Sequence, residues 1–538
     1  MLSAGMSGAR AQNVWQQIKQ RGVLTIATDA TYPPFEFKVK GELVGFDKEL
    51  GDAICEQLKV KANWLPLEWT AVQGSLESHK ADVIMSGMTI TEERKKKGYT
   101  FSRPYFLSGQ AIARKQSDTS INALQDLGDK TVSVQDQTTG MTALQKAGLP
   151  EKQIIKFDTL PDGLMNVVNG KSAACVADVP ALTYTLQKSY TQLKMVGETT
   201  FPPEYLGLAA SRGEVELAAQ INQALDALMV NGVYAKIYAK WMGEPLSTHV
   251  IGQLDKVRNE GSAIPADIAA KVKTDSTAKG GQQTAAPTGL QTSSGSPLSI
   301  HWNLLREEFP QLWAGAVITL ELTLLTLVFG VTGGLIVALA RLSPFPLLRS
   351  LVVAYVELVR GTPLLVQIYF VYFVLPALNI SLDPLVSGAV ALSLNAAAYI
   401  SEIFRAGIES IDVGQMEAAR ALGMDYPAAM RWVILPQTVR RVLPPLTNEA
   451  VALLKDSSLV SVVGVTELMR RGRDIATETG SPTTLYLGVA AFYLMMTLPL
   501  TWLVRRLERK WQPISTDTRV ISENGSTASR QEESKKNG

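Results

Sequence analysis

The sequence predicts an α/β domain followed by an all-α domain that spans a membrane. Up to about residue 260, short apolar runs alternate with amphipathic helical patterns, which is typical of a soluble α/β fold. Residues 312–340 instead carry a single charge, that of Glu321, in a run long enough to cross a bilayer of about 30 Å. Between these regions, Gly261 to Pro297 is rich in Ser, Thr, Gly, Gln, Ala and Pro, as in flexible linkers.

Length, charge and the first residues narrow the possibilities further. The chain has 538 residues, more than one core usually holds, so two or more domains are expected. The net charge of +2 argues against a nucleic-acid binder. Ala9-Arg10-Ala11 before Gln12 is similar to the end of a secretory signal, but the charged and apolar regions that should precede it are missing. Residues 1–22 are therefore either an N-terminal segment with a signal remnant or a chance match.

The alternation in the first half predicts individual elements. The predicted strands are VLTIAT (23–28), ADVIMSG (81–87), QAIAR (110–114), KTVSVQ (130–135) and AACVAD (173–178). The predicted helical segments are 46–58, 161–170 and 216–242. Such alternation gives sheets with helices on both faces and ligands at the carboxyl ends of the strands.

Four sequence blocks in this half stand in the order of a known family. They are TDATYPPFEF from Thr28, GFDKELGDAI from Gly45, MSGMTITEER from Met85 and FSRPY from Phe101. Residues 23–246 thereby resemble the extracytoplasmic solute-binding proteins for polar amino acids. The resemblance implies a two-lobed, periplasmic-binding-protein-like domain of type II. Lobe one would cover about 23–110 and 201–246, lobe two about 111–200, and a flexible linker 247–300.

The resemblance also implies a site for a free amino acid, whose carboxylate and ammonium both need partners outside water. Arg94 matches the two-pronged partner of the carboxylate, supported by Thr89 and by donors near Thr139. Asp178 matches the partner of the ammonium. Two other interpretations stay open at this point. Arg94 lies in the charged stretch EERKKK and would alone be a solvated residue, and Asp178 would alone be a helix cap.

The remaining expected contacts concern the side chain of the ligand. Tyr32 and Trp69 would stack on its stem, and Ser86 and Gly87 belong to the same ligand-binding set. Asp29 matches the position that meets the distal group of the ligand. An unpaired carboxylate there favours a cation and disfavours glutamate. The alternative is that Asp29 only holds the turn before Tyr32-Pro33-Pro34.

The second half predicts a permease-like domain over 301–512. Five membrane segments are expected, at about 312–340, 351–376, 384–404, 446–466 and 483–504, the fourth interrupted by Lys455 and Asp456. Positive residues lie after the first, third and fifth segments: Arg341, Arg349, Arg405, Arg420, Arg431, Arg440, Arg441, Arg505, Arg506, Arg509 and Lys510. This places the N-terminus outside and the C-terminus inside.

A cluster of arginines and a paired charge need separate explanations. Arg470, Arg471 and Arg473 oppose the positive-inside rule, and we expect them to pack against protein near the outer surface. Glu357 and Arg360 stand three residues apart and would pair on one helix face.

A polar island between membrane segments, EAARALGMDYPAAMRWVILP from Glu417 to Pro436, predicts a helix-turn-helix. Gly423 permits the chain to reverse, and Asp425 can cap a second helix that has Pro427 in its first turn. The spacing resembles the cytoplasmic coupling loop of ABC importer permeases, with Val433 where Ile is usual. The resemblance places the loop at 405–441 and assigns contact with an ATPase to Glu417, Ala418, Ala419, Gly423 and Pro436. The alternative is an ordinary amphipathic helix pair.

Further blocks, RGTPLLVQ from Arg360, NAAAYISEIFRAGIES from Asn395 and LKDSSLVSVVG from Leu454, resemble permeases for polar amino acids. Gly170-Lys171-Ser172 ends like a phosphate-binding loop, but the first glycine would fall at Met165. With no other such loop in the chain, ATP is expected on a separate subunit and no cofactor on this chain.

Together these features imply a receptor fused to its permease in an ATP-driven importer of the bacterial inner membrane. The resemblance implies a homodimer in the lipid bilayer with two ATP-binding subunits, and residues 513–538 are expected to form a disordered cytoplasmic tail. Basic amino acids are the expected substrates, with glutamine or a broader polar set as the alternative. Two other functions are less favoured. A ligand-gated channel would interrupt its binding domain with pore segments, whereas the binding domain here is contiguous. An enzyme of the dehydratase type would not need the membrane spans.

Overall fold

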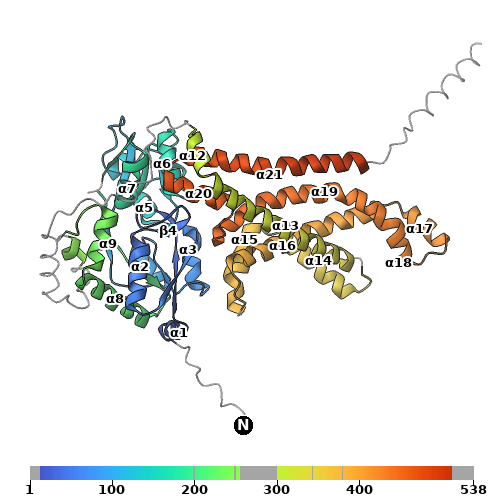
Figure 1. Ribbon diagram of the computed structural model, residues 1–538, viewed down its shortest axis with the longest axis horizontal. Coiled ribbons are helices and arrows are strands. Elements are labelled where there is room, and N and C mark those ends of the chain that lie inside the picture. Colours follow the sequence, from blue (N-terminus) through green and yellow to red (C-terminus); the bar gives the residue numbers. More distant parts are fainter. Residues whose placement is uncertain are drawn as a thin grey trace, which may run out of the picture.

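The computed structural model describes residues 13–197, 200–247, 250–254, 300–341, 343–378 and 380–511. The possible signal remnant in 1–12, most of the predicted linker (255–299) and the predicted tail (513–538) lie outside the described residues. An α/β domain and an elongated helical domain lie end to end (Figure 1).

The first lobe of the α/β domain is built on a five-stranded sheet of order β5-β1-β6-β15-β7. Its strands are β1 (Val23–Thr28), β5 (Lys61–Pro66), β6 (Val83–Ile84), β7 (Thr100–Phe101) and β15 (Ala209–Ala210). A smaller sheet holds β2 (Thr31–Tyr32), β3 (Glu36–Val39) and β4 (Glu42–Val44). The helices are α1 (Val14–Arg21), α2 (Phe46–Gln57), α3 (Trp69–Glu77), α4 (Glu92–Lys97), α8 (Val215–Val230) and α9 (Val233–Met242).

Side-chain alternation along β1 explains how this sheet is covered on both faces. Ile26 belongs to the core that includes α2, whereas the adjacent Ala27 belongs to the core that includes α3. Trp15 and Ile18 of α1 are buried in the same core as Ile26, so the packed lobe begins before residue 23.

The second lobe has a five-stranded sheet of order β11-β10-β12-β9-β13. Its strands are β9 (Gln110–Lys115), β10 (Val132–Gln135), β11 (Ile154–Phe157), β12 (Ala174–Asp178) and β13 (Leu193–Val196), and its helices are α5 (Thr139–Lys146), α6 (Leu160–Val168) and α7 (Val179–Ser189). Between the two larger sheets, β8 (Phe106–Ser108) pairs antiparallel with β14 (Glu204–Leu206). The chain therefore passes between the lobes through this pair of strands.

One predicted helical segment is divided. Residues 216–242 form two helices, because Asn231 ends α8 and Gly232 takes a left-handed φ of 76°. Glycine adopts that conformation without a steric penalty, so the chain turns there.

The helical domain contains α12 (Trp302–Glu307), α13 (Phe309–Arg341), α14 (Pro346–Arg360), α15 (Leu364–Tyr369), α16 (Pro384–Glu409), α17 (Val413–Ala421), α18 (Tyr426–Ala429), α19 (Leu435–Asp456), α20 (Leu468–Thr479) and α21 (Pro482–Trp511). Small residues let α13 and α16 approach closely. A Cβ added to Gly330 would lie 2.7 Å from Ala396, and one added to Gly334 would lie 2.8 Å from Ile400.

Three helices in the described part of the chain are long and apolar enough to cross a membrane: α13, α16 and residues 482–502 of α21. The expected membrane segment over 351–376 is not one straight helix. Its two parts, α14 and the segment Leu364–Val374, meet at an angle of 109°. Pro363 lies at this break in an extended conformation. Proline offers no N–H for a helix and disfavours helix in the residue before it, so the helix is interrupted here.

The expected span at 446–466 takes another form: α19 starts at Leu435, and a 3-10 helix, Ser457–Val463, continues from it. Among the residues that the structure describes, the helical domain thus has three apolar spans, or four if the bent pair is one span, and the count of five stays a prediction.

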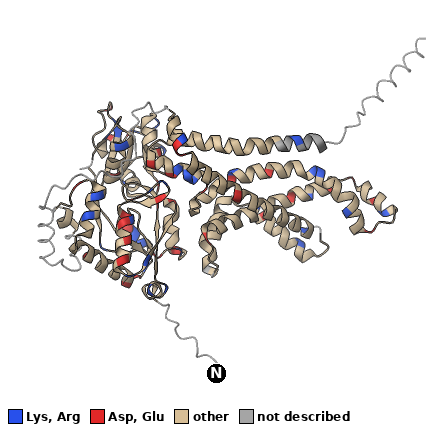
Figure 2. Cartoon of the chain, in the orientation of Figure 1, with Lys and Arg blue, Asp and Glu red and all other residues tan. Residues whose placement is uncertain are grey.

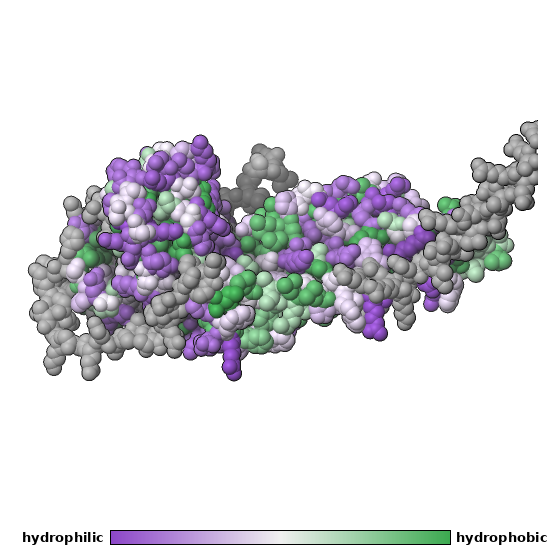
Figure 3. All heavy atoms as spheres, turned by 90° about the horizontal axis from the view of Figure 1, so that it is seen from above, coloured by the Kyte–Doolittle hydropathy of each residue, from purple (hydrophilic) through white to green (hydrophobic). Residues whose placement is uncertain are grey.

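The surface of the helical domain fits a lipid environment. Large apolar side chains of α13 are exposed, with Leu324 at 64% and Ile336 at 62%. Apolar residues gather on the part of this domain next to the α/β domain in Figure 3, whereas the α/β domain is mostly hydrophilic. Charged residues are sparse along the middle of these helices in Figure 2. Since water-exposed proteins rarely carry such apolar surfaces, this region contacts lipid.

Candidate functional site: a cleft between the lobes and a distal helical knob

A small cavity of about 30 Å³ lies between the two lobes. Its lining includes every ligand-binding residue predicted from the sequence: Asp29, Tyr32, Trp69, Ser86, Gly87, Thr89, Arg94, Thr139 and Asp178. Glu36, Gln135 and Thr138 line it as well. Residues far apart in the sequence thus meet around one polar space between the lobes.

The sheets explain why these residues meet. Asp29 follows β1, Trp69 opens the helix after β5, and Ser86 follows β6. In the second lobe, Thr138 follows β10 and Asp178 ends β12. Because β1, β5 and β6 are parallel, as are β10 and β12, their carboxyl ends meet at one edge of each sheet.

Arg94 turns inward from a charged helix. It lies in the first turn of α4, which Thr91 caps by accepting a hydrogen bond from the Arg94 backbone N–H. Its guanidinium donates to the carbonyl oxygen of Thr89 at 2.8 Å and to that of Gln137, in the second lobe, at 3.4 Å. It also lies over the Trp69 ring, 5.7 Å from the centroid. The guanidinium therefore lines the cavity and bridges the lobes.

Asp178 occupies the N-cap position of α7, but its side chain makes no capping hydrogen bond. It accepts hydrogen bonds from the Tyr32 hydroxyl and from the Gln110 amide, the latter at 2.5 Å. Burial, together with the negative charge of Glu204, raises the pKa of Asp178 to about 7. A ligand cation would relieve both effects.

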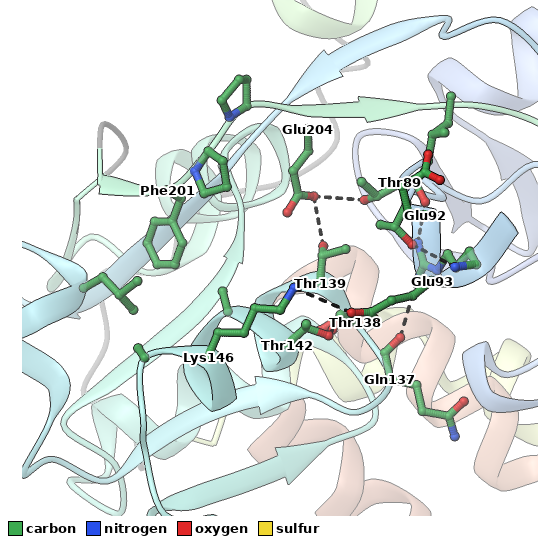
Figure 4. A pocket seen from close by; sticks show the side chains of 18 of the residues that line it. Thr89, Glu92, Glu93, Gln137, Thr138, Thr139, Thr142, Lys146, Phe201 and Glu204 are labelled. Carbon is green, nitrogen blue, oxygen red and sulfur yellow. Dashed lines mark hydrogen bonds and ion pairs between the residues drawn. The ribbon is translucent and has the colours of Figure 1, made fainter. Parts of the chain in front are cut away.

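Glu204 is a site residue that the sequence reasoning did not single out. Its carboxylate accepts hydrogen bonds from the hydroxyls of Thr89 and Thr139, both at 2.9 Å, as Figure 4 shows. Gln110 donates to the same oxygen at 3.3 Å. Glu204 also lines a larger cavity of about 840 Å³, which shares Thr89 and Arg94 with the small one. The expected hydroxyl donors therefore face an internal carboxylate.

The positions of Gln110 and Glu204 in the sequence could have identified them as site residues. Gln110 lies beside the expected crossing at 110/111, and Glu204 lies three positions after the crossing at 200/201. Polar residues at the points where the chain changes lobe border the cleft by topology.

Ser86 and Gly87 are already engaged within the first lobe. The Ser86 hydroxyl accepts from the Asp29 backbone N–H at 2.9 Å and donates to Glu36 at 2.7 Å. The Gly87 N–H donates to Asp47 at 2.9 Å. Burial raises the pKa of Glu36 well above its usual range. These contacts fix the wall of the cavity and the backbone of Asp29.

The predicted helix-turn-helix, Glu417 to Pro436, forms at the end of the helical domain farthest from the α/β domain (Figure 1). We call this segment the knob. The helix α17 ends before Gly423, whose φ is 85°, and Asp425 caps α18 by accepting from the Ala428 N–H at 2.8 Å. A π-helical turn, Met430–Ile434, leads into α19, which has Pro436 in its first turn. Leu422 is 81% exposed and Trp432 is 66% exposed.

Comparisons with known proteins cover both domains. Residues 24–244 match the family described as bacterial extracellular solute-binding proteins, family 3. Residues 330–513 match the binding-protein-dependent transport system inner membrane component. An L-cystine transport system permease protein of Bacillus subtilis, TcyB, is 40% identical over 214 residues, which are 39% of this chain and 92% of the relative.

Two further relatives are similar in the same region. The glutamine permease GlnP of Escherichia coli is 39% identical, with 40% of this chain and 98% of the relative covered. The arginine permease ArtQ of Bacillus subtilis is 38% identical, and the similarity covers 38% of this chain and 93% of the relative. The chain belongs to the family of amino acid ABC permeases. It is a permease fused to a solute-binding domain.

Among solved structures, an ancestral arginine-binding protein bound to glutamine is 42% identical, with 42% of the fused permease and 99% of that chain covered, at a TM-score of 0.39. The arginine-, lysine-, histidine-binding protein ArtJ of Geobacillus stearothermophilus is 33% identical, at a TM-score of 0.40. The similarity covers 44% of the fused permease and 99% of that chain.

The two domains of the fused permease share an extensive interface. One apolar core joins Leu67, Val72 and Leu76 of the solute-binding domain to Ile368 and Val460 of the permease domain. Around it, polar contacts cluster on α20. This helix carries the three arginines expected to pack against protein: Arg470, Arg471 and Arg473.

These polar contacts are specific. Lys38 pairs with Asp474 at 2.6 Å, and both side chains are buried. Arg473 pairs with Glu68 of the first lobe and lies 3.8 Å from Asp158 of the second. The arginines that oppose the positive-inside rule therefore pack against the solute-binding domain, which confirms the expected packing against protein. Their place near the outer surface stays a prediction.

Proposed function

We propose that the fused permease imports basic amino acids, namely arginine, lysine or histidine, using ATP hydrolysed by a separate subunit. The observation that carries this substrate class is the charge of the cavity lining. It contains the three carboxyl groups of Asp29, Glu36 and Asp178 but a single guanidinium, that of Arg94. Glu204 adds a fourth carboxyl beside it.

The charges of the cavity lining can be compared with the charges that an amino acid ligand carries. Every free amino acid brings one carboxylate, for which Arg94 is the partner, and one ammonium, for which Asp178 is the partner. Burial keeps Glu36 protonated, so the excess negative charge of the site comes from Asp29 and Glu204. A cationic side chain neutralises part of it, whereas a glutamate side chain would add to it in a poorly screened space.

Glutamine is the second candidate. Its side-chain amide can donate to Asp29 without carrying a charge, and the similarity to a glutamine permease, 39% identical in the membrane part, supports it.

The knob supplies the site for the ATPase in this proposal. Its exposed apolar side chains, such as Leu422 and Trp432, offer a partner surface at the end of the permease domain away from the receptor. We place the solute-binding domain outside the membrane and the knob in the cytoplasm, and propose a homodimer with two ATP-binding subunits. Glu417, Ala418, Ala419, Gly423 and Pro436 are the proposed contacts.

Uptake of labelled arginine into proteoliposomes that contain the full chain and its ATPase tests the proposal. Unlabelled lysine and histidine should compete strongly, glutamine less, and glutamate least. Asp29→Asn removes one charge-assisted contact with the ligand. Unlabelled arginine should therefore compete for uptake roughly tenfold less strongly in this variant, whereas competition by glutamine should weaken much less. Asp129→Asn, at a carboxyl whose side chain is 80% exposed, is the control. Glutamate as the strongest competitor would refute the proposed substrate class.

A further inference from the structure

We propose that Arg470 of the permease domain is the counter-charge of Asp29 when the two domains are docked, and that it competes there with the cationic side chain of the ligand. Docking would then weaken the binding of basic amino acids more than that of glutamine. This inference rests on the proposed substrate class and assigns a specificity role to a residue outside the solute-binding domain.

The first observation is an incompletely paired guanidinium. Arg470 is 1% exposed. Its Nε donates to Asp474 at 3.2 Å, but neither Nη1 nor Nη2 has a hydrogen-bond partner among the described residues. Lys38 already binds the other oxygen of Asp474 at 2.6 Å. A buried charge with two free donors is costly, so a nearby anion has a large effect on it.

The second observation identifies that anion. A second cavity of about 30 Å³ is lined by Arg470 and Arg473 from α20 and by four carboxyl groups of the receptor, those of Asp29, Glu68, Asp136 and Asp158. Asp136 pairs with Lys156 at 3.5 Å, and Asp158 lies 3.8 Å from Arg473. Arg473 already pairs with Glu68, whereas the ends of Arg470 are free. Asp29 makes one side-chain hydrogen bond, accepted from the Thr31 hydroxyl at 2.8 Å.

Asp29 stands between the two small cavities. It lines the ligand cavity and the one that holds Arg470, and Trp69 and Gln135 also line both. Burial raises the pKa of Asp29 and the charge of Arg470 opposes this shift, with a resulting pKa of about 6. The permease thus presents a positive charge to the far side of a carboxyl that the ligand approaches from the cleft.

The position of Arg470 is fixed by its helix. Glu467 caps α20 by accepting from the backbone N–H groups of Met469 and Arg470, both at 2.8 Å. A fixed guanidinium and a ligand cation on one carboxylate repel each other across a space of low dielectric. Glutamine carries no such charge. Docking should therefore loosen the hold on a basic substrate at the permease, where it must be released.

The test is equilibrium binding of labelled arginine and labelled glutamine to the full chain in lipid nanodiscs without ATPase. Arg470→Met should strengthen arginine binding by roughly tenfold and change glutamine binding by less than about twofold. Arg471→Met is the matched control. It removes a charge from the same helix, but Arg471 lies against Gly41 and lines neither cavity. It should leave the ratio of the two affinities unchanged.

Arg470→Gln, which keeps a polar contact with Asp474, repeats the test if Arg470→Met does not fold. Equal changes for arginine and glutamine, or equal effects of the Arg470 and Arg471 variants, would overturn the inference while the substrate class stands. Wild-type chain that binds glutamine but no basic amino acid would refute the proposed substrate class and the inference with it.

Discussion

At the scale of single residues, the cleft is a set of carboxyl groups whose ionisation is opposed by burial. Burial raises the pKa of Asp178 to about 7 and that of Asp29 to about 6. Each carboxyl must lose its proton to pair with a cation of the ligand. Ligand affinity is therefore linked to pH in the range where these groups titrate.

This linkage predicts that arginine binding weakens as the pH falls below about 7. The ligand pairs with the ionised carboxyls, so it must displace protons, first from Asp178 and then, below about pH 6, from Asp29. The dissociation constant should rise about tenfold for each proton displaced per pH unit. Calorimetry of the full chain between pH 5 and 8 measures this. Glutamine, which has no distal cation, should show the shallower slope, and a pH-independent arginine affinity would contradict the assignment.

Arg94 makes a separate prediction at this scale. Arg94→Ala leaves the carboxylate of the ligand without its charged partner, a loss of about 3–5 kcal/mol as for other broken buried pairs. Binding should become undetectable in calorimetry. Folding should persist, because the Arg94 side-chain hydrogen bonds end on the carbonyl oxygens of Thr89 and Gln137. Lys96→Ala, on the exposed side of the same helix, is the control.

At the scale of elements, the knob depends on one backbone conformation. Gly423 has a φ of 85°, and a Cβ placed there would meet nothing within 4 Å. A side chain at this position is therefore opposed by the backbone and not by crowding. The left-handed conformation costs an L-residue roughly 1–2 kcal/mol, which is enough to change the angle between α17 and α18.

Gly423→Ala should accordingly reduce transport while leaving ligand binding intact. The altered knob would seat poorly on the ATPase, so we expect transport and ligand-stimulated ATP hydrolysis to fall together in proteoliposomes. Gly213→Ala provides the same backbone strain elsewhere, since Gly213 has a φ of 84° and open space around its Cβ position. Normal import by the Gly423 variant would show that the ATPase docks elsewhere.

At the scale of the whole molecule, a receptor and a permease are joined by buried charges as well as by an apolar core. The Lys38–Asp474 pair connects β3 to α20 across the interface. Arg473 and Tyr486 reach the second lobe, the latter through a hydrogen bond from its hydroxyl to Asp162 at 3.2 Å. The permease therefore touches both lobes of its receptor.

Breaking the central pair should loosen the docked state. Lys38→Met removes a charged hydrogen bond of about 2 kcal/mol, which is roughly a 30-fold shift toward the undocked form. Asp474 keeps its contact with Arg470, which limits the loss. Fluorescence energy transfer between cysteines introduced into α8 and α17 measures docking, because Cys55 and Cys175 are buried and unreactive to labels. Lys48→Met, at an ion pair within α2, should leave docking unchanged.

Features that depend on neighbouring residues can be predicted from the amino-acid sequence alone. Periodicity marked β1 and the apolar spans of α13, α16 and α21, and the cap residue Asp425 with Gly423 marked the knob. The break at Pro363 was also encoded locally, by Gly361 and Pro363, although the mean hydropathy of 351–376 hid it because most other residues of the segment are apolar. The motifs around Thr28 and Met85 pointed to the residues that line the cleft.

Which side chains far apart in the sequence share one space depends on how the elements and the two domains pack together. It brought Glu204 to Thr89 and Thr139, and it packed the arginines of α20 against the receptor. No local pattern encodes such pairings, because they arise from how sheets and helices pack and from which buried charges then lie close enough to interact. For the same reason, the place of Arg470 beside Asp29 became visible only when the two domains were seen together.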